Sequence, residues 1–565
     1  MGYRRQRGNT RSRLRRRHVF ALVSVSVTVL AVVLASCVAT AKPDTATAQS
    51  VADAFVSALN EGDVDAAAEQ TSYPNAAKEA IGQMFDGLDP KDATFKVSQF
   101  MDLGTTTSFF TMSANWNFGP GRDWAYEVQG SLRNLSVGWR ISWDPAVVAP
   151  NLTGDRSVRY DRTDAAPPTV LDAGGGVLMN EQIINTIKLD PATMPDPADT
   201  TRRLADVLAP VAPIINAEYM TNEMRAHPGE QVEAVKLRDQ DYNYLGPEKF
   251  ALPGVIVERT PTLITADRRI STPLVDPYRT VWQANRDATA GWAVHTVGTD
   301  GTVIPEAGFQ GPPGPDIRTT LDTRVQLAAT EAVVTAGTPA AVVAIQPSTG
   351  AVLAAAQNNQ AIEKGPIAFT GSTPSGNSLD LVRSAAGWSR GVEPKDVSVE
   401  DVEVTGHSLG LGRNYDIPGL EQKTAQFTSA REGMDQAMSQ RDDDLPAVTP
   451  FGLAVLAASI ARGAPVEPRI VQDQPATTDV RADALAPDVT ERLRAAMRES
   501  AARGPEQLRA FPDLMGGGAQ RDTDRWYFGV RGDLAFAVFV ENADGGDRAV
   551  QMTDKFMQEL SKPAP

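Results

Sequence analysis

The stretch AAVVAIQPSTGAVLAAAQ, residues 340–357, decides how the second half of this chain folds. Two runs of small and β-branched apolar residues flank a Pro-Ser-Thr-Gly turn, a pattern that predicts a β-hairpin with both strands buried. RWYFGVRGDLAFAVFVEN, residues 525–542, has the same character and turns at Arg531-Gly532-Asp533. The sequence therefore predicts two apolar hairpins that lie far apart in the chain.

Between the two hairpins lies VTPFGLAVLAASIARG, residues 448–463, which predicts a buried helix. Thr449 is the expected N-cap, Pro450 the first helical residue and Gly463 the stop. Hairpin, helix and hairpin in this order resemble the transpeptidase domain shared by penicillin-binding proteins and serine β-lactamases. The resemblance implies an α/β domain of that kind over residues 313–565.

The first part of the mature chain has a different pattern. Apolar residues from Val51 to Leu59 form a helical stripe, a Gly-Asp break follows, and a second short helix comes next. Strings of alternating polarity then predict an antiparallel sheet, so that two helices laid on a curved sheet fit residues 47–148. GWRISWDPAVVAPNLTGDRSVRYDRT, residues 138–163, resembles the exit from the nuclear-transport-factor-like cone of methicillin-resistance-type penicillin-binding proteins.

These resemblances imply a multidomain α+β protein similar to class B penicillin-binding proteins of the methicillin-resistance type. A nuclear-transport-factor-like N-terminal domain is expected at 47–150, a mixed α/β pedestal of the dimerisation type at 151–312, and the transpeptidase/β-lactamase-like domain at 313–565. A length of 565 residues also predicts about three or four domains. PPTVLDAGGGVLM, residues 167–179, lacks both arginines of the family's signature at that place, which marks the copy as divergent.

The N-terminus has the layout of a secretory signal, with eight arginines and no acid before an apolar run that ends at Ser36. Leu34-Ala35-Ser36-Cys37 resembles a bacterial lipobox, so we expect residues 1–36 to be a lipoprotein signal peptide, Cys37 to be lipidated, and residues 37–46 to be a tether. The alternative is a single uncleaved N-terminal transmembrane anchor. Both place the rest of the chain at the extracytoplasmic face of the bacterial cytoplasmic membrane.

Composition excludes some functions. Removing residues 1–36 leaves 46 basic against 70 acidic residues, a net charge of −24, which makes nucleic acid a poor partner. Cys37 is the only cysteine, so no internal disulfide can form and stability has to come from packed cores.

The chemistry of the resembled family needs a serine and, one helical turn later, a lysine that accepts its proton. No serine of this chain has a lysine three residues later. By resemblance, Ser372 in FTGSTPSG takes the place of the nucleophile and Ser375 replaces the lysine. A better helix start follows at Ser378, which is the expected N-cap, so that Ser372 lies on a loop.

The family's second and third motifs are also incomplete. The string Ser375-Gly376-Asn377 matches S-x-N but follows Ser372 directly, so we interpret it as a chance match. Before the last hairpin, Gly516, Gly517 and Gly518 replace the K-T-G motif, and no lysine is present there. Lys423-Thr424-Ala425 imitates that motif but precedes the buried helix and so belongs to the wrong segment.

Other candidate sites are weak. His227, His295 and His407 have no metal-ligand spacing, and the run Asp442-Asp443-Asp444 is more typical of a solvated loop than of a calcium site. We expect neither a metal nor a cofactor.

Three functions remain open. The first is a catalytically degenerate scaffold or regulator in peptidoglycan assembly, whose partners are stem peptides or cell-wall synthases. The second is an active penicillin-binding D,D-transpeptidase with Ser372 as nucleophile and a base from elsewhere. The third is a non-enzymatic ligand-binding lipoprotein, which needs a large closed apolar pocket within residues 47–310.

Overall fold

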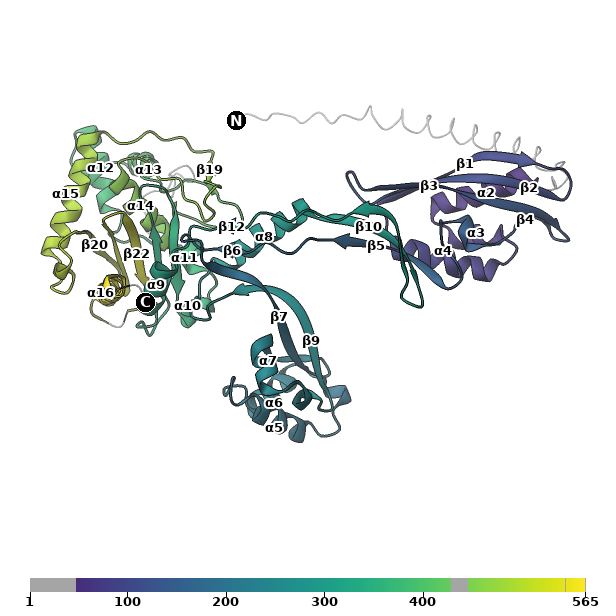
Figure 1. The fold of residues 1–565 in the computed structure, drawn as a ribbon. Helices are drawn as coiled ribbons and strands as arrows, with labels where there is room; N and C mark the ends of the chain where they lie inside the picture. The colour runs from purple at the N-terminus through teal and green to yellow at the C-terminus, as the bar shows by residue number, and fades with distance from the viewer. Residues whose placement is uncertain (1–46, 428–445, 544, 564–565) are drawn as a thin grey trace, which may run out of the picture. The chain divides into compact units, whose positions relative to one another are not determined.

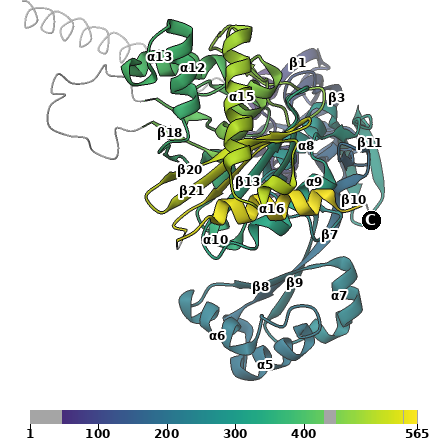
Figure 2. The same cartoon turned by 90° about the vertical axis from the view of Figure 1, so that its left-hand side faces the viewer.

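The computed structural model describes residues 47–427, 446–543 and 545–563. These residues form two compact units, drawn in Figure 1 and from a second side in Figure 2. The N-terminal unit contains the described residues up to Thr163 together with Gly291–Gly311, and the C-terminal unit contains Asp164–Ala290 and the described residues from Pro312 onward. The domain boundaries expected at 150 and 312 stay predictions.

The N-terminal unit packs helices against an antiparallel sheet with strand order β1-β2-β3-β4. The strands are β1 (Asp92–Asp102), β2 (Thr107–Asn117), β3 (Asp123–Leu135) and β4 (Gly138–Ile141). The helices are α2 (Ala48–Glu61), α3 (Val64–Glu69) and α4 (Pro74–Leu88). Phe55, Trp116 and Leu132 are buried between the helices and the sheet, as the alternating pattern predicted.

The expectation of two helices on this sheet was wrong, because α4 is a third. Pro74 begins it and Asp89 ends it in a left-handed conformation. Gly82 and Gly87 weaken the helical signal in the sequence. Gly87 is nevertheless required by packing, because a Cβ there would collide with the carbonyl oxygen of Val158 on β5.

A second sheet completes the N-terminal unit from segments far apart in the chain. Its order is β11-β10-β5, with β5 (Arg156–Thr163), β10 (Gly291–Gly298) and β11 (Val303–Phe309). Trp292 and Val294 of β10 belong to the same core as the helices. The chain therefore leaves this unit after β5 and returns to it with β10.

The first part of the C-terminal unit is built on the long strand β7 (Val177–Leu189), which pairs with β8 (Val232–Arg238) and β9 (Val255–Thr265). The short strands β6 (Val170–Leu171) and β12 (Ile317–Arg318) extend this sheet. Its helices are α5 (Pro197–Leu208), α6 (Ala217–Ala226), α7 (Asp239–Leu245) and α8 (Val275–Thr289).

Both predicted hairpins are confirmed, and the structure joins them, with β20 as a fifth strand, in one sheet. Its order is β14-β13-β22-β21-β20. The strands are β13 (Ala340–Ile345), β14 (Val352–Gln357), β20 (Leu514–Arg521), β21 (Asp524–Arg531) and β22 (Leu534–Val540). β13 and β22 pair along their full length, which leaves β14 and β20 at the edges.

Helices cover both faces of this sheet. On one face, α9 (Thr323–Val333) and α16 (Arg548–Ser561) share a core with Val342 and Val538. On the other face, α14 (Pro450–Arg462) and α15 (Pro487–Arg503) share a core with Val343 and Phe539. The short helices of this unit are α10 (Asn359–Ile362), α11 (Ile367–Thr370), α12 (Asp380–Arg390) and α13 (Val399–Ser408).

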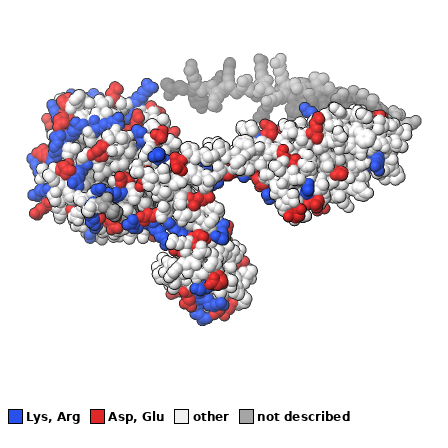
Figure 3. Space-filling view, viewed as in Figure 1, with Lys and Arg blue, Asp and Glu red and all other residues white. Residues whose placement is uncertain are grey.

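The predicted multidomain α+β class is confirmed. Within the described ranges, no helix is both long and apolar enough to cross a membrane. On the face shown in Figure 3, acidic and basic side chains are interspersed over the C-terminal unit.

Candidate functional site

The Gly-Ser-Thr segment is extended and lies outside any helix. The single turn of α11 ends before Gly371, and Thr373–Pro374 form the short strand β15. β15 pairs with β18 (Ala447–Val448), which also pairs with β17 (Ala425–Gln426). Ser372 therefore lies directly before a strand of a small three-stranded sheet. This position outside a helix agrees with the expected loop.

An extended backbone separates the two serines that the resemblance made partners. Successive side chains of an extended segment point to opposite sides, so residues three apart lie on opposite sides, whereas on a helix they share a face. Ser372 is exposed, and Ser375 is buried with only 5% of its surface exposed. The Ser375 N–H donates to the carbonyl oxygen of Pro446 at 2.8 Å. A side chain at position 375 is thus directed away from the Ser372 hydroxyl.

No side chain in the described part of the chain forms a hydrogen bond with the Ser372 hydroxyl. The role of Ser372 as a nucleophile stays a prediction. A general base has to lie within hydrogen-bond reach of the proton that it removes, directly or through one water.

The predicted start of the following helix was wrong. α12 begins at Asp380, and its N-cap position is held by Leu379, whose side chain forms no capping hydrogen bond. Ser378 is buried in a turn. Its N–H donates to the carbonyl oxygen of Ser375 at 3.0 Å. Because the turn directs Ser378 inward, its hydroxyl cannot reach the first free N–H groups of the helix.

Gly516, Gly517 and Gly518 lie on β20, at the edge of the five-stranded sheet. A Cβ at Gly517 would lie 2.7 Å from the hydroxyl oxygen of Ser500 on α15, and a Cβ at Gly516 would lie 2.5 Å from the carbonyl oxygen of Phe528. The first two glycines therefore let α15 and β21 approach the strand closely. Close packing is therefore sufficient to explain why glycine occupies these two positions.

The cation carried by β20 is Arg521, which the sequence reasoning missed. Its Nε lies 3.0 Å from the carboxylate of Asp522, and the arginine side chain is mostly buried. Arg521 follows the position of the expected lysine by only a few residues. The sequence LMGGGAQR has no alternating pattern, so nothing local indicated that Arg521 belongs to this strand.

The string Ser375-Gly376-Asn377 contacts this same strand, which its position in the sequence did not indicate. The side-chain oxygen of Asn377 accepts the N–H of Gln520 at 2.7 Å. Gly376 has a φ of +52°, and a Cβ there would collide with the carbonyl oxygen of Gln520. The loop before α12 thus closes one end of the open edge of β20.

The rest of that edge is available for pairing. In an antiparallel ladder, every second residue directs its N–H and C=O away from the neighbouring strand. Because the N–H of Gln520 points outward to Asn377, the backbone groups of Gly518 and Gly516 also point outward. In the described residues, no backbone group outside the sheet bonds to these two glycines. An extended peptide can add to this edge as a further strand.

Lys423 is not part of this strand. Its N–H donates to the carbonyl oxygen of Phe369 at 2.9 Å, its side chain is exposed, and it precedes β17. The Lys-Thr-Ala string therefore lies on a different segment from β20, as expected.

The three histidines lie on separate elements: His227 follows α6, His295 is on β10 and His407 is on α13. Among the described residues, no group of three His, Cys, Asp or Glu side chains could hold a metal ion. Cys37 and the run Asp442-Asp443-Asp444 lie outside the described residues.

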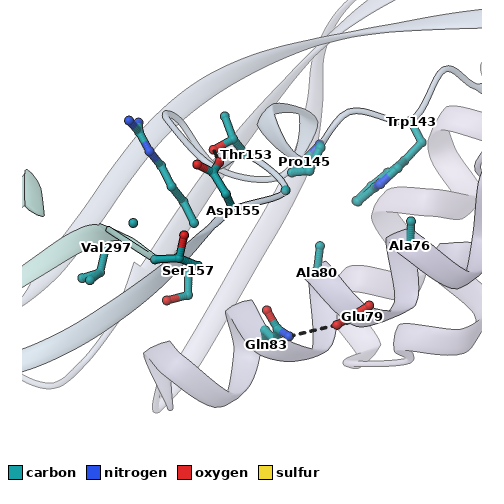
Figure 4. A pocket seen from close by; sticks show the side chains of 14 residues that line it. Ala76, Glu79, Ala80, Gln83, Trp143, Pro145, Thr153, Asp155, Ser157 and Val297 are labelled. Atoms are coloured by element: carbon teal, nitrogen blue, oxygen red, sulfur yellow. Dashed lines mark hydrogen bonds between the residues drawn. The ribbon is translucent and has the colours of Figure 1, made fainter. Parts of the chain in front are cut away.

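The N-terminal unit has a cavity of about 460 Å³ between α4 and the segment that enters β5, shown in Figure 4. Glu79 and Gln83 of α4 line one side, and Asp155 lies across from them. The hydroxyl of Thr153 donates to the Asp155 carboxylate at 2.6 Å, which lowers the pKa of that carboxyl. The lining mixes these polar groups with apolar side chains such as Trp143 and Val297, so it is not the uniformly apolar pocket that a carrier of apolar ligands needs.

Residues 47–156 match the family model described as the NTF2-like N-terminal transpeptidase domain, MecA_N. No curated protein matches the chain. The expected nuclear-transport-factor-like domain is thereby confirmed, and the chain carries a MecA-like N-terminal domain joined to further α/β domains.

Proposed function

We propose that this protein is a penicillin-binding-protein-like lipoprotein that acts in peptidoglycan assembly as a catalytically degenerate scaffold or regulator. The matched N-terminal domain supports a transpeptidase-type protein. Assignment to class B of the methicillin-resistance type is part of the proposal. So is attachment to the extracytoplasmic face of the membrane through a lipid on Cys37.

The extended backbone around Ser372 is the observation that supports the proposed lack of catalytic activity. Acylation of a serine by an amide or a β-lactam needs a group that accepts the hydroxyl proton. Ser375 replaces the lysine and is buried on the opposite side of the segment. β20 lacks the lysine that would bind the substrate carboxylate.

What the domain retains is an edge on which a peptide can lie. The outward backbone groups of Gly516 and Gly518 offer main-chain hydrogen bonds to an extended stem peptide. Arg521, which is paired with the exposed carboxylate of Asp522, lies at the end of the strand and is the cation nearest in sequence to the position of the expected lysine. Binding without acylation would let the protein report on stem peptides or present them to a synthase.

The decisive experiment is covalent labelling with a fluorescent penicillin. Full-length protein in bacterial membranes is incubated with the label beside an active penicillin-binding protein in the same preparation. We expect no stoichiometric adduct on this chain. An adduct that disappears in Ser372→Ala would overturn the proposal in favour of the D,D-transpeptidase, which keeps Ser372 as nucleophile and takes its base from elsewhere.

Binding at the edge has its own test. Gly518→Pro removes the outward N–H, whereas Gly518→Ala retains it, and a Cβ at this position has room because its nearest neighbour is 3.7 Å away. We expect a synthetic stem pentapeptide to bind wild type and Gly518→Ala in calorimetry and to bind Gly518→Pro at least about tenfold more weakly. Equal affinity for all three proteins would place the peptide elsewhere.

A further inference from the structure

The N-terminal unit presents five large apolar side chains to solvent where two of its hairpins turn. Met101 and Leu103 are each 61% exposed, and Val137 is 67% exposed. Phe109 and Leu135 are 45% and 40% exposed. We call these five residues the apolar tip. Single exposed apolar residues are ordinary on a protein surface, but a gathered set marks an interaction site.

The β1–β2 and β3–β4 turns lie at the same end of the sheet. Asp102 pairs with Ser108, Ser108 with Leu132, and Leu132 with Ile141, so all four strands share this level. Asn134 joins the two turns directly: its N–H donates to the carbonyl oxygen of Thr106 at 3.1 Å, and its side chain donates to that of Thr105 at 3.2 Å. The apolar tip is therefore one surface.

The chain enters the N-terminal unit at this same end. Near the end of α2, the side chain of Asn60 binds the N–H and the carbonyl oxygen of Phe95 at 2.7 and 2.9 Å, and Phe95 lies toward the opposite end of β1. From Asn60 back to Ala48 the helix rises about 18 Å, toward the level of the tip. α2 also contacts β4, which belongs to the tip end of the sheet.

The tether before α2 is short. Ten residues, 38–47, separate Cys37 from the first helical residue, Ala48. Fully extended, they span at most about 35 Å. A lipid on Cys37 would therefore hold the end of the unit that bears the apolar tip near the bilayer surface.

The polar residues beside the tip suit a lipid surface. Arg133 is exposed and Arg140 is half-buried, while Asp102 is the one acid within the two turns. Trp139, between the arginines, is partly exposed, and tryptophan is enriched where a protein meets the headgroup region. This local excess of positive charge occurs in a chain that, without residues 1–36, has a net charge of −24, and it favours anionic headgroups.

We infer that the apolar tip inserts into the surface of an anionic lipid bilayer, so that the N-terminal unit docks on the membrane that anchors the chain. This inference rests on the lipid anchor of the proposed function. It does not depend on whether the transpeptidase-like domain is catalytically degenerate.

A fluorescent probe at the tip tests the inference. In the lipidated full-length protein the thiol of Cys37 is consumed, so Val137→Cys can be labelled alone with an environment-sensitive fluorophore. Asp92→Cys is the matched control, because Asp92 is exposed and begins β1 at the opposite end of the sheet. Both proteins are reconstituted into vesicles of equal parts phosphatidylglycerol and phosphatidylethanolamine, with and without nitroxide-labelled acyl chains.

We expect a blue shift and nitroxide quenching for the probe at position 137 and neither effect at position 92. Equal solvent exposure of both probes would overturn the inference. A blue shift at 137 in lipid-free detergent that grows with protein concentration would also overturn it, and would point to a second copy of the chain as the occupant.

A separate result identifies failure of the anchor. If Cys37 of the wild type takes up the fluorophore, the anchor of the proposed function is wrong. The tip is then tested in Cys37→Ser/Val137→Cys protein added to the same vesicles, with the same two outcomes.

Discussion

Replacing Ser375 by lysine should fail to create a catalytic pair with Ser372. Read as a helix, FTGSTPSG would need only this lysine to restore the family's motif. In the structure the segment is extended, and position 375 faces the interior beside Pro446. Ser375→Lys thus distinguishes a helical from an extended backbone between Ser372 and position 375.

The expected cost to stability follows from burial. Ser375 exposes only 5% of its surface. Burial at such depth disfavours the charged form of a lysine and lowers its pKa, and a buried charge without a partner costs about 3 to 5 kcal/mol of stability. Forcing the longer side chain into a packed site adds about 1 to 3 kcal/mol. Against a typical domain stability of about 5 to 15 kcal/mol, the variant should unfold at a clearly lower temperature.

Two measurements on the same samples decide the matter: fluorescent penicillin labelling and the thermal midpoint by calorimetry. We expect Ser375→Lys to show no adduct and a lowered midpoint. Ser375→Ala, which loses only a hydroxyl at the same position, should also form no adduct and stay close to wild type in stability. A stoichiometric adduct on Ser375→Lys that vanishes when Ser372→Ala is added would refute the extended arrangement.

Three further variants probe the surroundings of the site and the N-terminal unit. Thr449→Ala should destabilise the C-terminal unit by about 2 kcal/mol in urea unfolding, because the buried hydroxyl caps α14 at 2.9 Å and also donates to a backbone carbonyl at 2.6 Å; Thr449→Ser should recover most of the loss. Gly376→Ala should detach its loop from β20 and speed amide exchange of that strand, whereas Gly391→Ala, also at positive φ but with open space around it, should leave β20 protected. Thr153→Val should raise the pKa of Asp155 toward its ordinary value. Since a lowered carboxyl pKa adds stability above the ordinary pKa that is lost as the pH falls, the wild type's thermal advantage over Thr153→Val should be present at neutral pH and disappear in acid; a constant difference from neutral to acid pH would contradict this.

Local patterns in the sequence were sufficient for the elements that carry strong signals. The helix from Pro450 to Arg462 was predicted with its cap and its stop, because Thr449, Pro450 and Gly463 each favour one backbone conformation at one helix position. Both hairpins were predicted for a similar reason: apolar β-branched and aromatic runs broken by turn residues have few other folds available. The helix α4 was not predicted, because its glycines weaken the helical pattern of the sequence.

The site depended on contacts between distant segments. Nothing in the string Ser375-Gly376-Asn377 indicates that Asn377 binds Gln520 across more than a hundred residues of chain. The backbone between Ser372 and Ser375 is extended because β18, which lies more than seventy residues further along the chain, pairs with it.

By itself, the sequence determined the order of the landmarks, the absence of a serine followed by lysine at the helical spacing, the glycine run before the last hairpin, and the single cysteine after an apolar run. These are statements about residue identity, and no folding can change them. The tertiary structure decided which face each side chain occupies: Ser375 inward, Asn377 on the edge of β20, and Val137 in solvent. Those placements follow from pairing and packing of segments remote in the chain, whose energies are invisible to any local pattern.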